Sequence, residues 1–88
     1  MQKVDPLLIC EKFNKIRIEL QHQKFSPTEL SKILRENVGM SNVYIVESKK
    51  RGFFRSRKNG SAIEYCFTDT PIGKAQFIKL YEDMRKTF

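Results

Sequence analysis

The residues best suited to binding a ligand are basic, and most of the excess positive charge lies in one short segment. Residues 49–58 read KKRGFFRSRK and carry six basic side chains and no acidic one: Lys49, Lys50, Arg51, Arg55, Arg57 and Lys58. The chain has 17 Lys and Arg against 10 Asp and Glu, a net charge of +7, so outside this segment bases and acids nearly balance. A solvated charged face is one interpretation, but so local an excess favours a binding surface for a polyanion.

Few residues suited to catalysis or metal binding accompany these cations. His22 is the only histidine and lies where a helix is expected to end, so we interpret it as a solvated helix-end residue. Cys10 and Cys66 have no CxxC spacing; we expect two small buried side chains in a reducing cytosol, with a disulfide as the alternative. The sequence PIGK at 71–74 lacks the other glycines of a P-loop. We therefore expect no enzyme activity, no cofactor and no metal site.

The length of 88 residues suits one domain with a modest core. Residues 1–5 are predicted to form a short flexible tail and residues 6–88 the domain. We expect no signal peptide at the start of the sequence, and no apolar run in it approaches the length of a membrane span. We expect a cytoplasmic or nucleoid-associated protein, or a nuclear one in a eukaryote.

Two helices are predicted in the first half of the chain. From Pro6 onward, apolar residues recur with helical spacing at Ile9, Phe13, Ile16 and Leu20. The sequence FSPTEL then indicates a second helix start, with Ser26 as cap, Pro27 at the first position and Glu29 completing a capping box. This helix is expected to run to about Asn37 and to end at Gly39.

Residues 42–51 are the most ambiguous segment. Ser41 is a plausible cap, and a helix running to Gly52 would complete a helix-turn-helix unit with the preceding helix. The sequence NVYIVES is also rich in β-branched residues, so a strand is the alternative. We favour the helix.

A β-hairpin is predicted around Asn59-Gly60, the pair that a two-residue type I′ turn prefers. This turn sets Lys58 opposite Ser61, and it continues with the pairs Arg57–Ala62, Ser56–Ile63, Arg55–Glu64 and Phe54–Tyr65. One face then carries Phe54, Ile63, Tyr65 and Phe67, and the other carries Arg55, Arg57 and Glu64.

A last helix is predicted after the hairpin, with Thr70 as cap and Pro71 at its first position. Its apolar face is expected to carry Phe77, Leu80, Tyr81, Met84 and Phe88. These side chains suit a core, with a dimer surface as the alternative.

The predicted arrangement brings cations to two places on one rigid scaffold. Phe54 would anchor the hairpin to the core, while basic side chains project from the end of one helix and from the hairpin tip. Two separated groups of cations suit a polyanion with repeating geometry, and duplex DNA presents a row of phosphates on either side of each groove.

Over residues 7–84 the chain resembles the winged helix-turn-helix family of DNA-binding domains. The resemblance rests on SPTELSKILRENVG-MS as the turn-helix unit, on RGFFRSRKNGSAIEYCFTDT as the strand-wing-strand, and on FTDTPIG as the step into the closing helix. It implies an α+β, mostly helical fold of three helices, a two-stranded β-hairpin wing and a C-terminal helix. One stretch departs from the family pattern. An apolar residue is usual near the end of the recognition helix, but Ser48, Lys49 and Lys50 stand there, so the apolar positions stop at Val46.

The resemblance also implies roles for individual residues. The helix at 42–51 would be the recognition helix in the major groove, with Asn42, Tyr44, Glu47 and Ser48 exposed toward base edges and Asn42 a candidate for adenine. Packing within the protein is the alternative for Tyr44. The remaining expected contacts are with phosphates or in the minor groove, from Ser26, Thr28, Ser41, Lys49, Lys50, Arg51, Arg55, Arg57, Lys58 and Asn59.

Two functions remain open at the level of the sequence. The first is double-stranded DNA binding by a small transcriptional regulator or a mobile-element accessory factor, acting as a monomer or as a homodimer through the last helix. The second is a winged-helix adaptor that binds a protein or RNA. Affinity for random duplex DNA at low salt distinguishes them.

Overall fold

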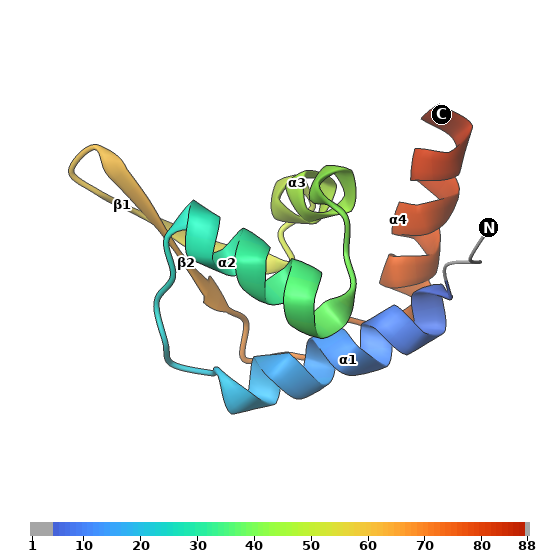
Figure 1. Ribbon diagram of the computed structural model, residues 1–88, viewed down its shortest axis with the longest axis horizontal. Coiled ribbons are helices and arrows are strands. Elements are labelled where there is room, and N and C mark those ends of the chain that lie inside the picture. Colours follow the sequence, from blue (N-terminus) through green and yellow to red (C-terminus); the bar gives the residue numbers. More distant parts are fainter. Residues whose placement is uncertain (1–4, 88) are drawn as a thin grey trace.

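The computed structural model describes residues 5–87, so residues 1–4 of the predicted tail and Phe88 lie outside it. The described elements are α1 (Pro6–Glu19), α2 (Pro27–Ile33), a π-helical turn (Leu34–Val38), α3 (Asn42–Lys50), β1 (Phe54–Asn59), β2 (Ala62–Phe67) and α4 (Lys74–Thr87) (Figure 1). Across residues 5–87 this is a small, mostly helical α+β fold with one two-stranded antiparallel sheet, as the sequence predicts.

The first helix begins where its capping residues dictate. Oδ1 of Asp5 accepts a hydrogen bond from the Leu7 N–H at 3.0 Å, and Pro6 takes the first helical position, where no N–H is needed. Every member of the predicted apolar stripe is buried or packs against the core: Ile9, Phe13, Ile16 and Leu20.

The predicted capping box at the start of α2 is confirmed. Oγ of Ser26 accepts a hydrogen bond from the Glu29 N–H at 3.2 Å, and Oε1 of Glu29 accepts one from the Ser26 N–H at 3.4 Å. The helix closes as predicted at Gly39, whose φ of +84° lies in the left-handed region. Its N–H donates to the carbonyl oxygen of Leu34 at 2.9 Å, which completes the π-helical turn.

Residues 42–50 form a helix, so the helical interpretation of this segment is confirmed. Ile45 and Ser48, three residues apart, face the interior and are buried. Ser48 belongs to the stretch 48–50, where the sequence lacks the apolar residue expected near the end of this helix. Its hydroxyl donates to the Ile45 carbonyl oxygen at 2.8 Å, so the buried hydroxyl is satisfied within its own helix.

The hairpin forms, but its predicted register is wrong. Asn59 pairs with Ala62 and Lys58 with Ile63, so the two turn residues are Gly60 and Ser61. Of these two turn residues only Gly60 has a positive φ, +65°, which is the pattern of a type II′ turn. The predicted type I′ turn at Asn59-Gly60 would have required a positive φ at Asn59 as well. Each residue of β1 therefore pairs two positions further along β2 than predicted. A shift of two keeps every side chain on its predicted face.

The last helix begins at Lys74 rather than at Pro71, so Thr70 is not its cap. A contact with α1 causes the delay. Oδ1 of Asn14 accepts a hydrogen bond from the Ile72 N–H, and Nδ2 of Asn14 donates to the Ile72 carbonyl oxygen, both at 2.9 Å. These two bonds tie the backbone at residue 72 to α1 instead of to a helix of its own.

Phenylalanine rings from four parts of the chain meet in the core. The ring centroid of Phe13 on α1 lies 6.2 Å from that of Phe53, 5.4 Å from Phe54, 5.7 Å from Phe67 and 5.2 Å from Phe77. Aromatic pairs in such edge and tilted geometries stabilise by about 0.5–1.5 kcal/mol each beyond their burial. The adjacent phenylalanines within the basic segment thus anchor both the end of α3 and the start of β1.

The apolar face of α4 is used in this same core. Phe77, Leu80, Tyr81 and Met84 are all buried, as predicted for a core face. The alternative dimer surface built from these side chains is not available, because the chain's own core covers them.

Both cysteines are free thiols, so the disulfide alternative is wrong. Cys10 is buried as predicted, and burial raises the pKa of its thiol. Cys66 on β2 is only half-buried.

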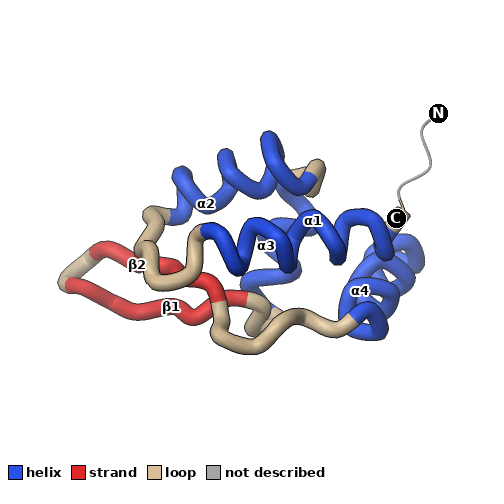
Figure 2. The backbone as a smooth tube through the Cα atoms, turned by 90° about the horizontal axis from the view of Figure 1, so that it is seen from below, coloured by secondary structure: helices blue, strands red, loops and turns tan. Residues whose placement is uncertain are grey.

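The helix α3 lies between the hairpin and α4 in both views of the backbone (Figures 1 and 2). The hairpin extends away from the helices at one end of the molecule. Among the helices of residues 5–87, none combines the length and apolar character needed to cross a bilayer.

Candidate nucleic-acid interface

The burial pattern of α3 defines which of its side chains can meet a partner. Asn42, Val46 and Lys50 are exposed and, being four residues apart, lie in one row along the outside of the helix. Lys49 lies on the hairpin side of this row. Glu47 lies on the α4 side, next to Val43.

A contact between Lys49 and Tyr65 joins α3 to the hairpin. Nζ of Lys49 lies 4.9 Å from the centroid of the Tyr65 ring on β2, within the range of a cation–π interaction. Partial burial lowers the pKa of the Lys49 ammonium. Within residues 5–87 Lys49 forms no ion pair, so this partly desolvated charge is not offset by a carboxylate.

Tyr65 identifies the side of the hairpin that adjoins α3. Because side chains alternate along a strand, Lys58 and its partner Ile63 share the Tyr65 side and are exposed near the tip. We call the combined surface the α3–hairpin face; it consists of Asn42, Val46, Lys49, Lys50, Lys58, Ile63 and Tyr65.

Arg51 is not part of the α3–hairpin face. Its Nη2 donates to Oδ2 of Asp83 on α4 at 3.0 Å, and its Nε donates to Oε1 of Glu47 at 3.1 Å. The hydrogen bond from Arg51 lowers the pKa of the Asp83 carboxyl. Two carboxylates from the chain itself therefore neutralise the guanidinium that was predicted to approach a phosphate.

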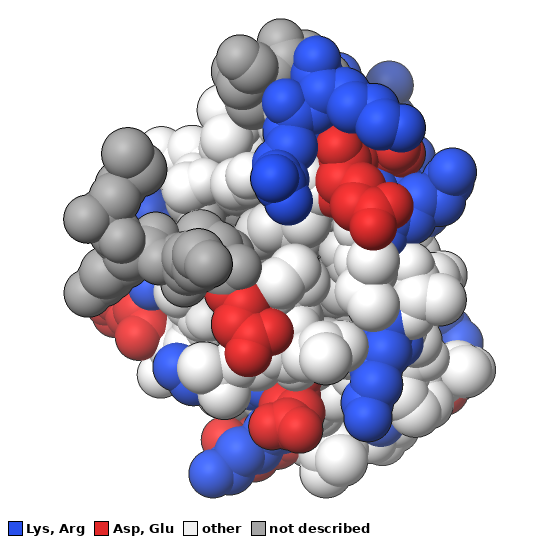
Figure 3. Space-filling model, turned by 90° about the vertical axis from the view of Figure 1, so that its right-hand side faces the viewer, with Lys and Arg blue, Asp and Glu red and all other residues white. Residues whose placement is uncertain are grey.

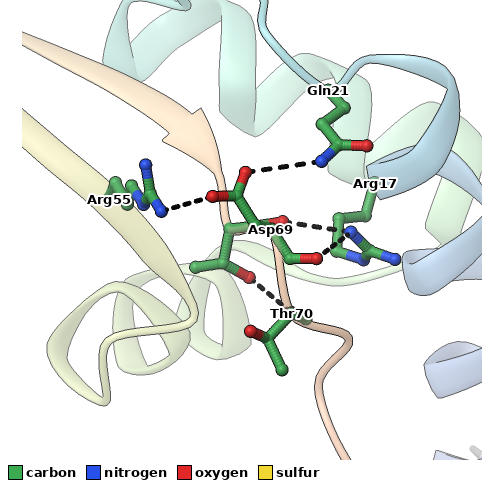
Figure 4. A network of polar contacts seen from close by, with 6 residues as sticks. Arg17, Gln21, Arg55, Asp69 and Thr70 are labelled. Carbon is green, nitrogen blue, oxygen red and sulfur yellow. Dashed lines mark hydrogen bonds and ion pairs between the residues drawn. The ribbon is translucent and has the colours of Figure 1, made fainter.

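Arg55 is also paired within the protein. Its Nη2 lies 2.7 Å from Oδ2 of Asp69, and Nε2 of Gln21 donates to the other carboxylate oxygen at 3.4 Å (Figure 4). The Gln21 hydrogen bond and the charge of Arg55 lower the pKa of Asp69. Arg55 and Asp69 are both more than half exposed, so a phosphate could displace this carboxylate at small cost.

A buried arginine supports the loop that carries Asp69. Nη1 of Arg17 donates to the carbonyl oxygens of Thr68 at 3.1 Å and Asp69 at 3.0 Å (Figure 4). Arg17 is 6% exposed, and these contacts fix the segment after β2 against α1. In the sequence Arg17 is indistinguishable from a solvated residue of the first helix, so its role was not predicted.

Arg57 and Lys58 are both exposed and unpaired within residues 5–87, but they point to opposite sides of the hairpin. Arg57 faces its cross-strand partner Glu64 on the side away from α3. The Glu64 carboxylate has two other partners. Its Oε2 lies 3.9 Å from Nζ of Lys24, and its Oε1 accepts a hydrogen bond from Nδ2 of Asn59 at 3.2 Å. The expected cation cluster is thus divided, and of the two hairpin-tip cations only Lys58 lies on the α3–hairpin face with Lys49 and Lys50.

The side chain of Asn42 is oriented by a neighbouring arginine. Nη1 of Arg35 donates to Oδ1 of Asn42 at 2.8 Å. Both side chains are exposed. Arg35 therefore adds a cation at the end of the α3–hairpin face opposite Lys50.

The two predicted caps differ in what they leave free. The hydroxyl and N–H of Ser26 are occupied by the capping box, so Ser26 is a poor phosphate ligand in this state. The Ser41 side chain makes no capping hydrogen bond, and both Ser41 and Thr28 are exposed. The predicted contacts from Ser41 and Thr28 remain sterically open.

Two of the predicted base-reading residues point inward. Ser48 is 0% exposed. Tyr44 is half-buried, and its ring stacks on that of Tyr81 with centroids 4.2 Å apart and an interplanar angle of 11°. Val43 and Val46 are exposed instead. They were not predicted as site residues, because a helical segment of uncertain phase does not show which β-branched residues face solvent.

Both signs of charge appear at the α4 end of the molecule. The described residues on the face shown in Figure 3 include Lys, Arg, Asp and Glu side chains on a mostly uncharged surface. The ion pair between Arg51 and Asp83 joins the end of α3 to α4.

Comparisons of the chain with known protein families, with curated proteins and with solved structures gave no match.

Proposed function

We propose that this protein binds double-stranded DNA as a winged helix-turn-helix domain. In this proposal α2 and α3 form the helix-turn-helix unit, α3 enters the major groove and the hairpin is the wing. The supporting observation is the Lys49–Tyr65 contact, which joins unpaired cations of α3 and of the hairpin along one surface. The major groove is about 12 Å wide and admits a helix whose outer row is exposed, as that of α3 is.

The proposal assigns base reading and phosphate binding to different residues. Asn42 and Val46 would face base edges from the outer row of α3. Lys49 and Lys50 would bind phosphates at one end of the helix, with Lys58 binding the backbone from the wing. Arg57, on the far side of the hairpin, would bind a second strand or the minor groove.

The salt dependence of binding tests this assignment. If the four unpaired cations Lys49, Lys50, Arg57 and Lys58 each neutralise one phosphate, log K against log[salt] should have a slope of about −3 to −4 for a random-sequence duplex. If all six predicted cations bind, the slope should approach about −5. Absence of duplex binding at low salt, or binding that salt does not weaken, would contradict the proposal.

The second candidate function is a winged-helix adaptor for a protein or an RNA. The observation that favours it is exposed aliphatic surface beside the cations: Val43, Val46 and Ile63 are each more than 40% exposed. In that case the same face should bind its partner while random duplex DNA shows no affinity at low salt.

A homodimer through α4 would have to use the outer side chains of that helix. Ile78 is 37% exposed and lies in an open pocket with Leu7 and Tyr81, whereas the main apolar face is buried. Sedimentation equilibrium on wild type and Ile78→Asp would test this arrangement, which would present two half-sites to DNA.

A further inference from the structure

Two aliphatic side chains lie on the part of α3 that the proposed function turns toward DNA. Val46 is 49% exposed and occupies the middle of the outer row, between Asn42 and Lys50. Val43 is 47% exposed and lies beside that row. Val46 therefore stands where the proposal places base edges.

The neighbour of Val46 in the row is an amide held in a defined orientation. Because Arg35 donates to Oδ1 of Asn42, this oxygen keeps one lone pair free and Nδ2 keeps both of its protons. An amide that accepts through its oxygen and donates through its nitrogen matches N6 and N7 of adenine in the major groove. Arg35 is thus a positioning residue for Asn42.

The spacing of Asn42 and Val46 fits neighbouring base pairs. Side chains four residues apart on a helix have Cβ atoms about 5–6 Å apart. Stacked bases are about 3.4 Å apart, so the two side chains would span about two steps of the duplex. In the major groove the only apolar group among the four bases is the C5-methyl group of thymine, and aliphatic side chains contact it.

We propose that α3 recognises A·T base pairs, with Asn42 bonded to adenine and Val46, flanked by Val43, packed on a thymine methyl group. This inference rests on the proposed function and adds its sequence preference. The charge of the surface favours DNA over a protein partner for these valines, because Lys50 follows in the same row while Arg35 and Lys49 flank it.

The test exchanges thymine for uracil, which removes only the methyl group. Duplexes selected by the protein from a random pool are amplified once with dTTP and once with dUTP, and both products are titrated with protein. Burial of one methyl group stabilises by about 0.8 kcal/mol, so affinity should fall about three- to fivefold for each contacted thymine.

Val46→Ala identifies the residue responsible. This variant should bind the dTTP duplex more weakly than wild type does and should lose most of the discrimination between the two duplexes. Ile18→Ala is the matched control, since Ile18 is an exposed aliphatic residue on α1 and its removal should leave the discrimination unchanged. Thermal denaturation of both variants establishes that they are folded.

Each outcome separates this inference from the proposed function. Equal affinity for the dTTP and dUTP duplexes, or a selected site without A·T pairs, would overturn the inference while duplex binding at low salt upheld the proposed function. Failure to bind any duplex would overturn both. Discrimination that persists in Val46→Ala would overturn the assignment to Val46.

Discussion

Lys49 and Tyr65 bring α3 and the hairpin together, with Nζ 4.9 Å from the centroid of the ring. The contact matters because it connects cations from two elements that share no backbone hydrogen bond along their length. It also leaves the ammonium without a carboxylate partner among residues 5–87. A surface of this kind is the main physical support for the proposed DNA binding.

Lys49→Met should separate the role of this charge from that of the aliphatic stem. Affinity for a random duplex should fall, and the slope of log K against log[salt] should become shallower by about 0.9. The free energy of unfolding should change by less than about 1 kcal/mol, since a cation–π contact near the surface contributes little. Lys12→Met on α1 is the control, and an unchanged slope in Lys49→Met would remove Lys49 from the interface.

Asp69→Asn should strengthen DNA binding. The substitution releases Arg55 from its carboxylate partner while keeping the shape of the side chain. One more phosphate contact would steepen the salt slope by about 0.9. A slope equal to that of wild type would mean that Arg55 does not reach the duplex.

The stability of the protein should fall in acid through Asp69 and Asp83. Hydrogen bonds from Gln21 to Asp69 and from Arg51 to Asp83 lower both pKa values below the ordinary value of 3.8. A carboxyl whose pKa is lower in the folded state stabilises above its unfolded pKa, and this contribution is lost as pH falls through the folded pKa. The free energy of unfolding, measured with urea at neutral pH and below about pH 4, should therefore fall less on acidification for Asp69→Asn than for wild type. Equal losses would show that Asp69 contributes nothing to the pH dependence.

Arg17→Met should destabilise the fold. The variant leaves the carbonyl oxygens of Thr68 and Asp69 without their donor, which should cost about 1–3 kcal/mol in the free energy of unfolding. Lys15→Met is the control, because Lys15 is exposed on the same helix and should change stability by less than about 0.5 kcal/mol. Equal effects of the two substitutions would contradict a structural role for Arg17.

The two serine caps provide a matched pair. Ser26→Ala removes the hydroxyl that accepts the Glu29 N–H and should cost about 1 kcal/mol, as measured by chemical denaturation. Ser41→Ala should lower the free energy of unfolding by only roughly a few tenths of a kcal/mol, since the Ser41 hydroxyl makes no capping bond. The reverse order would show that the capping geometry differs in solution.

Features set by neighbouring residues were predictable from the sequence. The Ser26–Glu29 box and the left-handed Gly39 depend on contacts within a few residues, and both are confirmed. Features set by distant residues were not. The start of α4 depends on Asn14 of the first helix, and the hairpin register depends on a choice between two overlapping turns that Gly60 can serve equally well.

The same distinction holds for the candidate site. The six cations were visible in the sequence, whereas their partners were not, since Asp83 and Asp69 reach Arg51 and Arg55 only through the tertiary fold. The phase of α3 was also undetermined, so Ser48 was expected at the surface and Val46 was overlooked.

The most direct test of DNA binding compares two pairs of lysines. Lys50 and Lys58 lie on the α3–hairpin face, and Lys12 and Lys15 are exposed on α1. Titration of a random duplex at several salt concentrations should show that replacing the first pair by Ala weakens binding and makes the salt slope shallower by about 2. The Lys12 and Lys15 replacement should leave the slope nearly unchanged. Equal effects of the two pairs would contradict a localised DNA-binding surface on this protein.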